Sequence, residues 1–168
     1  MTPEEAYQAV FWYAIGRLAK REYTVFELRE KLMLYVEAHA YVSVDADCIE
    51  TMLSRLQAER LLSDERYAEA YVRSYGERYG VLEIVRRLQE KGVSRALIER
   101  CREQLEATAL SSAYRLWQKR FTALPADGKE RQRQFAYLAR RGFAFETIYH
   151  LFDMLSQSNS PEQDIDIL

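Results

Sequence analysis

Apolar residues recur three and four positions apart along nearly all of this 168-residue chain, which is the spacing of one face of an α-helix. Little in the chain would interrupt such helices, because it contains only six glycines and three prolines, about half of average usage. All-β folds need many glycine- and proline-rich turns, and phosphate-binding loops need clustered glycines. The sequence therefore predicts an all-α fold and argues against both of these classes.

The apolar spacing predicts nine short helices, separated by hydroxyl caps and tight turns. Thr24, Ser63 and Ser94 precede apolar runs and are good N-caps, and Thr24 with Glu27 has the spacing of a capping box. The fourth helix is expected to run to about Tyr79 and to end at Gly80. A short break is expected after Leu105, between a sixth and a seventh helix.

One junction occurs three times, beginning at Leu18, Leu88 and Leu138. Each copy has a basic residue three positions on, an apolar residue at +5, a small or hydroxyl residue at +6 and an aliphatic residue at +10. Such a pattern describes a helix end, a turn and a new N-cap. The ordinary residue preferences of helix ends could also produce it without any structural repeat. The recurrence favours an elongated, curved array of three tandem three-helix repeats, in residues 1–62, 63–107 and 108–155, followed by a disordered acidic tail in 156–168.

Residues for catalysis or for metal binding are not grouped in the sequence. The two histidines, His39 and His150, and the two cysteines, Cys48 and Cys101, are far apart in the chain, and none belongs to a metal-ligand motif. We therefore expect no enzyme activity, no metal and no cofactor. The longest apolar run, residues 10–15, is too short to span a membrane, so a cytoplasmic protein is expected.

Charge is distributed unevenly, although the net charge is only −2. Residues 108–155 carry eight basic and four acidic side chains, whereas residues 1–62 carry seven and ten. Basic groups in this pattern contact phosphates or an acidic protein, or else form an ordinary solvated helix face. The candidate binding residues are Arg73, Arg86, Arg87, Lys91, Arg95, Lys119, Arg120, Lys129, Arg131, Arg133, Arg140 and Arg141. They include a first basic cluster of Arg86, Arg87, Lys91 and Arg95, and a second basic cluster of Lys129, Arg131, Arg133, Arg140 and Arg141.

Four tyrosines of the fourth predicted helix, Tyr67, Tyr71, Tyr75 and Tyr79, are spaced four residues apart on one face. Such a ladder could stack the bases of single-stranded nucleic acid, but aromatic stripes more often belong to the core. We expect Tyr67 and Tyr71 to be core residues and leave Tyr75 and Tyr79 open.

Four segments, in order and spacing, resemble the bacterial RecX family over roughly residues 8–155. They are Leu18-x-x-Arg-x-Tyr-Thr with Glu27-Leu28, Leu62-Ser-Asp-Glu-Arg-Tyr-Ala68, Leu88-x-x-Lys-Gly-Val-Ser94 and Arg140-Arg-Gly-Phe143. The resemblance implies tandem three-helix repeats and a regulator of the RecA recombinase.

The resemblance also implies a function, the regulation of RecA filaments. Members of the family bind the RecA–single-stranded DNA filament in its groove. They inhibit recombination and the co-protease activity that induces the SOS response, and so regulate DNA repair, without a catalytic centre of their own. For this chain we expect a monomer that has the RecA filament as partner, the single-stranded DNA within it as a further contact, weak direct DNA binding and no membrane.

Two other functions remain open at this stage. A helix-turn-helix regulator would place Arg95 and Arg100 in the major groove of duplex DNA. A helical scaffold that binds some other protein would have no effect on recombinase filaments.

Overall fold

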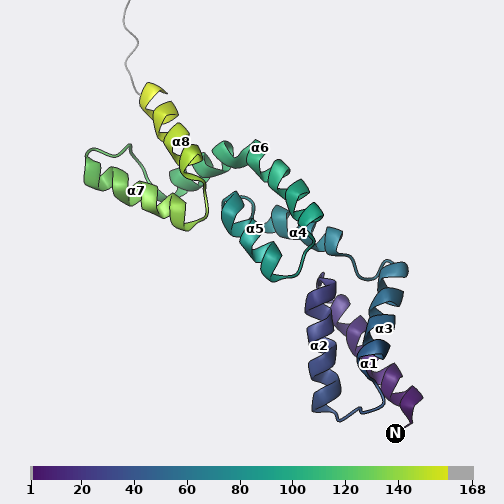
Figure 1. Cartoon of the computed structure of the whole chain (residues 1–168). Helices are drawn as coiled ribbons and strands as arrows, with labels where there is room; N and C mark the ends of the chain where they lie inside the picture. The colour runs from purple at the N-terminus through teal and green to yellow at the C-terminus, as the bar shows by residue number, and fades with distance from the viewer. Residues whose placement is uncertain (1, 159–168) are drawn as a thin grey trace, which may run out of the picture. The chain divides into compact units, whose positions relative to one another are not determined.

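The computed structural model describes residues 2–158, and this part of the chain contains eight α-helices and no strand (Figure 1). The prediction of an all-α fold is therefore confirmed. The helices are α1 (Pro3–Leu18), α2 (Val25–Ala38), α3 (Ala46–Ala58), α4 (Asp64–Tyr75), α5 (Val81–Glu90), α6 (Arg95–Arg120), α7 (Gly128–Arg140) and α8 (Phe145–Ser158).

The chain forms two compact units. The first unit contains residues up to 72 together with 86–101, and the second contains residues 73–85 together with those from 102 onward. Each unit buries an apolar cluster of its own. The first cluster joins α1, α2 and α3 through residues that include Val10, Leu28, Leu32, Met52 and Leu56. The second joins the C-terminal half of α6 to α7 and α8 through Leu116, Leu138, Phe143, Ile148 and Leu151.

The predicted hydroxyl caps form. The backbone N–H of Glu27 donates to Thr24 Oγ1 at 3.0 Å, that of Arg66 to Ser63 Oγ at 3.2 Å, and that of Leu97 to Ser94 Oγ at 3.4 Å. Side-chain oxygens at these positions satisfy amide groups that have no partner within the helix. Local sequence therefore determines where these helices begin.

The predicted break after Leu105 is wrong, because α6 is one continuous helix from Arg95 to Arg120. The segment between the two predicted helices has no glycine or proline. Its hydroxyl groups bond to carbonyl oxygens of the same helix: Thr108 donates to Leu105 at 3.3 Å and Ser111 to Thr108 at 2.9 Å. Hydroxyl residues that bond backward in this way continue a helix instead of capping a new one.

The fourth helix also differs from the prediction, since α4 ends at Tyr75 rather than near Tyr79. The N–H groups of Arg78 and Tyr79 both donate to the Tyr75 carbonyl, which closes a turn at the helix end. Gly76 follows Tyr75 directly, and glycine has a low helix propensity. Gly80, which was expected to terminate this helix, has a different role that is described below.

At the other end, α8 continues through Ser158, three residues into the segment predicted to be disordered. The rest of that predicted tail lies outside the described residues. None of the described helices combines the length and the apolar character that crossing a membrane requires.

Candidate functional site

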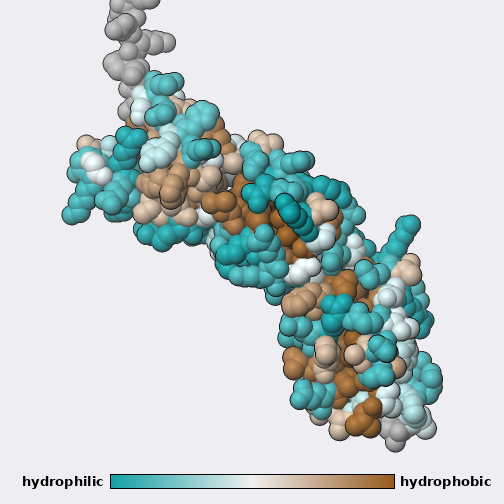
Figure 2. All heavy atoms as spheres, in the orientation of Figure 1, coloured by the Kyte–Doolittle hydropathy of each residue, from teal (hydrophilic) through white to brown (hydrophobic). Residues whose placement is uncertain are grey.

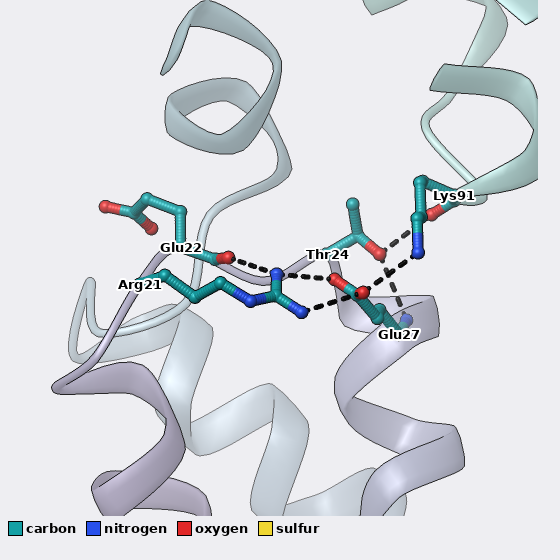
Figure 3. Close-up of polar contacts among 5 residues, drawn as sticks. All are labelled: Arg21, Glu22, Thr24, Glu27 and Lys91. Carbon is teal, nitrogen blue, oxygen red and sulfur yellow. Dashed lines mark hydrogen bonds and ion pairs between the residues drawn. The ribbon is translucent and has the colours of Figure 1, made fainter. Parts of the chain in front are cut away.

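Lys91, in the first basic cluster, is part of an intramolecular joint in the first compact unit (Figure 3). The Thr24 hydroxyl donates to the Lys91 carbonyl at 2.7 Å, and Lys91 Nζ lies 3.0 Å from a carboxylate oxygen of Glu27. Arg21 binds the same carboxylate through both guanidinium nitrogens, at 2.9 and 3.0 Å. The N-terminus of α2 is thereby bound to the turn between α5 and α6.

Glu27 is almost fully buried at this joint, with 8% of its surface exposed. Burial opposes ionisation, but the hydrogen bonds from Arg21 and Lys91 outweigh it, so the pKa of the Glu27 carboxyl lies below its ordinary value. Its carboxylate therefore completes an ion pair across the joint. Only one half of the predicted capping box forms, because Thr24 caps α2 whereas the Glu27 side chain bonds to the two cations.

Gly92 completes this joint. It has a φ of +71°, and a Cβ atom at this position would lie 2.6 Å from the Cβ of Phe26. The turn therefore requires a residue that tolerates positive φ and has no side chain. In this part of the chain, the first copy of the repeated junction, at Thr24, packs against the second copy, at Gly92.

The other members of the first basic cluster have different environments. Arg87 donates to the Tyr71 hydroxyl at 3.3 Å, and Arg86 forms an ion pair with Glu90 one turn along α5. Arg95 is exposed at the start of α6. Arg86 and Arg87 therefore have partners within the first unit, whereas Arg95 is exposed.

A second joint, in the second compact unit, is made by backbone groups. The N–H of Gly80 donates to the Arg141 carbonyl at 2.7 Å, and the N–H of Leu82 donates to the Gly142 carbonyl at 3.1 Å. A Cβ atom on Gly80 would lie 2.3 Å from the Gly142 oxygen. Gly80 therefore permits the start of α5 to approach the turn between α7 and α8.

Arg141 contributes to this second joint. Its guanidinium donates to the Arg78 carbonyl at 3.4 Å and lies 5.4 Å and 5.5 Å from the ring centres of Tyr79 and Tyr137. Cations over aromatic faces stabilise the fold. Like Lys91, Arg141 occupies the +3 position of a repeated junction and contacts another part of the same unit.

Three cations of the second basic cluster lie on one side of α7. Lys129, Arg133, Ala136 and Arg140 lie within about 60° of one another around α7, given 3.6 residues per turn. Lys129 and Arg140 are exposed, and neither has an ion-pair partner among the residues that the structure describes. Arg133 pairs with Glu130 at 2.8 Å at an exposed position. We call these four residues the cationic face of α7.

A shallow hollow of about 490 Å³ follows the N-terminal half of this face. It is lined by Asp127, Lys129, Glu130, Gln132, Arg133 and Ala136. The two cations of this lining are accompanied by two acids, and one of the acids, Glu130, pairs with Arg133. The cations of the face that are exposed and have no ion-pair partner among the described residues are Lys129 and Arg140, and exposed cations of this kind attract anions.

The remaining candidates lie elsewhere. Arg131 is on another side of α7, with its guanidinium 5.7 Å from the ring centre of Phe152. Lys119 and Arg120 are exposed in the last turn of α6, where cations complement the helix dipole. Arg73 is exposed on α4.

The tyrosine ladder does not form one stripe, since α4 ends before Tyr79. Tyr67 is 7% exposed and Tyr71 is half-buried, with their ring centres 6.0 Å apart. The expectation of a core position is therefore confirmed for Tyr67, whereas Tyr71 is only partly buried. Tyr75 and Tyr79 are both half-buried, with ring centres 6.2 Å apart.

An exposed aromatic group that the sequence analysis missed lies on α7 and α8. The Phe135 ring packs against Phe145 and Tyr149, with centre-to-centre distances of 5.3 and 5.1 Å. Phe145 and Tyr149 are 61% and 53% exposed, and Figure 2 shows apolar surface among hydrophilic side chains over α7 and α8. The sequence held one signal of this exposure. Phe145 is seven residues after Leu138 in the third copy of the repeated junction, and the exposed Arg95 has the same position after Leu88 in the second copy.

Within residues 2–158, no three histidine, cysteine or acidic side chains are grouped in a way that could hold a metal ion. The candidate site that the structure offers is the cationic face of α7, and the exposed rings around Phe135 form a separate surface feature. Such a surface recognises anions or proteins.

The architecture and this surface define a class of protein built from tandem three-helix domains. Models of the RecX second and third three-helix domains match residues 63–101 and 108–152. The regulatory protein RecX of Ralstonia pickettii is 34% identical over 131 residues, which cover 78% of each chain. The regulatory protein RecX of Halorhodospira halophila is 36% identical over 145 residues, covering 85% of this chain and 86% of the relative. This chain belongs to the RecX family.

A solved structure agrees with the fold. The crystal structure of RecX from Lactobacillus salivarius superposes with a TM-score of 0.77 at 19% identity, covering 92% of this chain and 99% of the other. The family relatives are named regulatory proteins, so a regulatory role fits this chain.

Proposed function

We propose that this protein is a non-enzymatic regulator in the cytoplasm that binds the RecA–single-stranded DNA filament in its groove. Binding inhibits recombination and the co-protease activity that induces the SOS response. Membership of the RecX family and the regulatory names of its relatives support the proposal. The chain acts as a monomer made of three tandem three-helix modules, in residues 1–62, 63–107 and 108–155.

The observation that carries the proposal is the cationic face of α7. Lys129 and Arg140 are exposed there, and they lie on the same side of the helix as Arg133. A filament groove presents DNA phosphates and acidic protein side chains, and both are attracted to such a face. Lys91 and Arg141 support the joints instead, so we remove them from the set of proposed contact residues.

Tandem modules allow several weak contacts with one polymer to combine into a stronger overall affinity. After one module binds a repeating polymer, the next meets its site at a high effective concentration, so overall affinity exceeds that of each contact. A binder of this kind prefers the assembled filament to a free recombinase subunit. This preference requires no catalytic chemistry.

A helix-turn-helix regulator of duplex DNA is the main alternative. Its recognition helix would be α6, with Arg95 and Arg100 near its N-terminus in the major groove. The turn before α6 is bound by α2 through Thr24, and Arg100 pairs with Glu65 at 2.8 Å. These contacts favour the filament over duplex DNA as the partner.

The test is charge reversal on the cationic face of α7. The double variant Lys129→Glu with Arg140→Glu should inhibit recombinase ATP hydrolysis on single-stranded DNA at least about tenfold less effectively at low salt, because each lost phosphate contact removes electrostatic attraction. The measurement is the protein concentration that halves ATP turnover.

The matched control is Lys20→Glu with Arg60→Glu, which makes the same charge change at exposed positions in the first unit. The control should inhibit as the unchanged protein does. Equal inhibition by both variants would show that the cationic face of α7 is the wrong surface. Failure of the unchanged protein to inhibit would reject the proposed function itself.

A further inference from the structure

The side of α2 opposite its buried leucines is exposed and partly apolar. Phe26, Met33 and Leu34 are 40%, 49% and 58% exposed there. Glu30 and Glu37 are exposed as well. All five residues lie within about 100° of one another around the helix, given 3.6 residues per turn. We call them the outer face of α2.

The two acids of the outer face are not neutralised by neighbouring cations. Neither Glu30 nor Glu37 has a hydrogen-bond or ion-pair partner for its side chain among the residues that the structure describes. Arg29, at the edge of the face, pairs with an acid of α3. Lys31 lies about 100° from Glu30 around the helix. The outer face therefore combines apolar side chains with uncompensated negative charge.

This combination indicates the chemistry of a partner. Large exposed apolar side chains that share one face are typical of surfaces that contact a protein or a membrane. The two acids repel the phosphates of nucleic acids and of lipid headgroups, and they attract lysine and arginine. Phe26 and Met33 are seven residues apart, which is two helical turns and a spacing at which one helix anchors another. A basic protein segment fits these features together.

We propose that the outer face of α2 docks a protein segment in which lysine or arginine accompanies aliphatic or aromatic side chains, as in a basic amphipathic helix. The apolar side chains of the face supply the contact area that leaves water. The acids select the positively charged segment and orient it. This surface is opposite in charge to the cationic face of α7, and the inference does not rest on the proposed function.

The experiment titrates the ¹⁵N-labelled full chain, at low salt, with a synthetic amphipathic helix of leucine and lysine, about 18 residues or five turns long. The measurement is the shift of the amide resonances of residues 25–38. The basic peptide should shift these resonances to saturation. A peptide with glutamate in place of lysine should not, and neither should oligothymidylate, because their charge is of the same sign as that of the face.

Three results of the titration would overturn the proposal. The first is a basic peptide that shifts only resonances outside α2. The second is an equal response of α2 to the basic peptide and to the acidic peptide or the oligonucleotide. The third is a shift of the same resonances when the protein concentration alone is raised, since a second copy of the chain would then cover the face.

Charge variants test the role of the acids. Glu30→Gln with Glu37→Gln should bind the basic peptide about threefold to tenfold more weakly, since exposed ion pairs contribute modestly to affinity. The matched control, Glu69→Gln with Glu103→Gln, makes the same charge change at exposed positions on α4 and α6. It should bind as the unchanged protein does. Equal affinities in the two variants would contradict the proposal.

An apolar variant tests the other half of the face. Met33→Ala with Leu34→Ala should weaken binding of the basic peptide about tenfold, because less apolar area leaves water. Both side chains are exposed in the free protein, so the folded structure should be retained, as the unchanged amide resonances of α1 and α3 would show. Undiminished affinity in this variant would also overturn the proposal.

Discussion

Glu27 illustrates how one residue can connect distant parts of a unit. Its carboxylate is buried between Arg21 and Lys91, and the partner Lys91 is 64 residues away in the chain. A buried carboxylate without cations would be strongly unfavourable, but paired and hydrogen-bonded it is stable. Removal of the charge therefore leaves two cations without their common partner.

We expect Glu27→Gln to destabilise the protein by about 1–3 kcal/mol at neutral pH, because the amide cannot replace two charge-assisted hydrogen bonds. Urea unfolding followed by circular dichroism measures the change. Glu50→Gln is the control, since Glu50 pairs with Arg29 at an exposed position and such pairs contribute at most about 1 kcal/mol. Equal losses in the two variants would contradict the role of burial at Glu27.

The same residue makes stability depend on pH. The pKa of Glu27 is lower in the folded protein than its ordinary value of 4.5. The stabilisation is therefore complete above that value and is lost as pH falls through the folded pKa. In Glu27→Gln the acid-side loss of stability should be shallower than in the unchanged protein, as urea midpoints measured between neutral pH and pH of about 3 would show. Parallel curves would mean that other carboxylates account for the acid sensitivity.

At the scale of elements, the two joints use different chemistry for the same purpose. In each, the N-terminal region of a helix, α2 or α5, contacts a glycine turn that precedes another helix. The first joint depends on the side chains of Thr24 and Glu27, whereas the second depends on backbone groups of Gly80 and Gly142. The second joint therefore tolerates no added carbon atom.

Gly80→Ala should destabilise the protein by at least about 2 kcal/mol, because its Cβ would meet the backbone of Gly142 at 2.3 Å and overpacking of this kind costs free energy. Gly16→Ala provides a sharp contrast. Gly16 lies inside α1 with nothing within 4 Å of its added Cβ, so alanine should stabilise the protein by about 0.5–1 kcal/mol. Thermal unfolding of the two variants should move in opposite directions, and a shared direction would refute this account.

For the whole molecule, the cationic face of α7 should make filament binding depend on salt. Each cation that contacts a phosphate contributes about one unit to the slope of log affinity against log salt. Lys129→Ala should therefore lower the magnitude of that slope by about one, as fluorescence anisotropy across a salt series would measure. Lys20→Ala in the first unit should leave the slope unchanged. An undiminished slope in Lys129→Ala would place the electrostatic contact elsewhere.

Local sequence predicted most of the helical structure. Apolar spacing located the helices, and Thr24, Ser63 and Ser94 cap them as expected. The break after Leu105 and the end of α4 were predicted wrongly, at positions where hydroxyl residues and glycine permit more than one structure. At Ser111 the hydroxyl bonds within its own helix, and nothing in the neighbouring residues distinguishes that choice from capping.

The sequence predicted that the candidate site is made of basic residues, but it did not predict which basic residues belong to the site. Lys91, Arg140 and Arg141 are equivalent as basic residues near helix ends. Of these three residues, Arg140 alone is exposed and has no ion-pair partner within residues 2–158, because Lys91 pairs with Glu27 and Arg141 contacts the rings of Tyr79 and Tyr137.

The amino-acid sequence by itself determined the all-α class, the caps and the resemblance to the RecX family, because these depend on contacts between residues three or four apart and on short motifs. The tertiary structure alone decided which cations form the joints and which are exposed. That choice depends on partners distant in the chain, such as Glu27 for Lys91, and no periodic pattern encodes a contact between them.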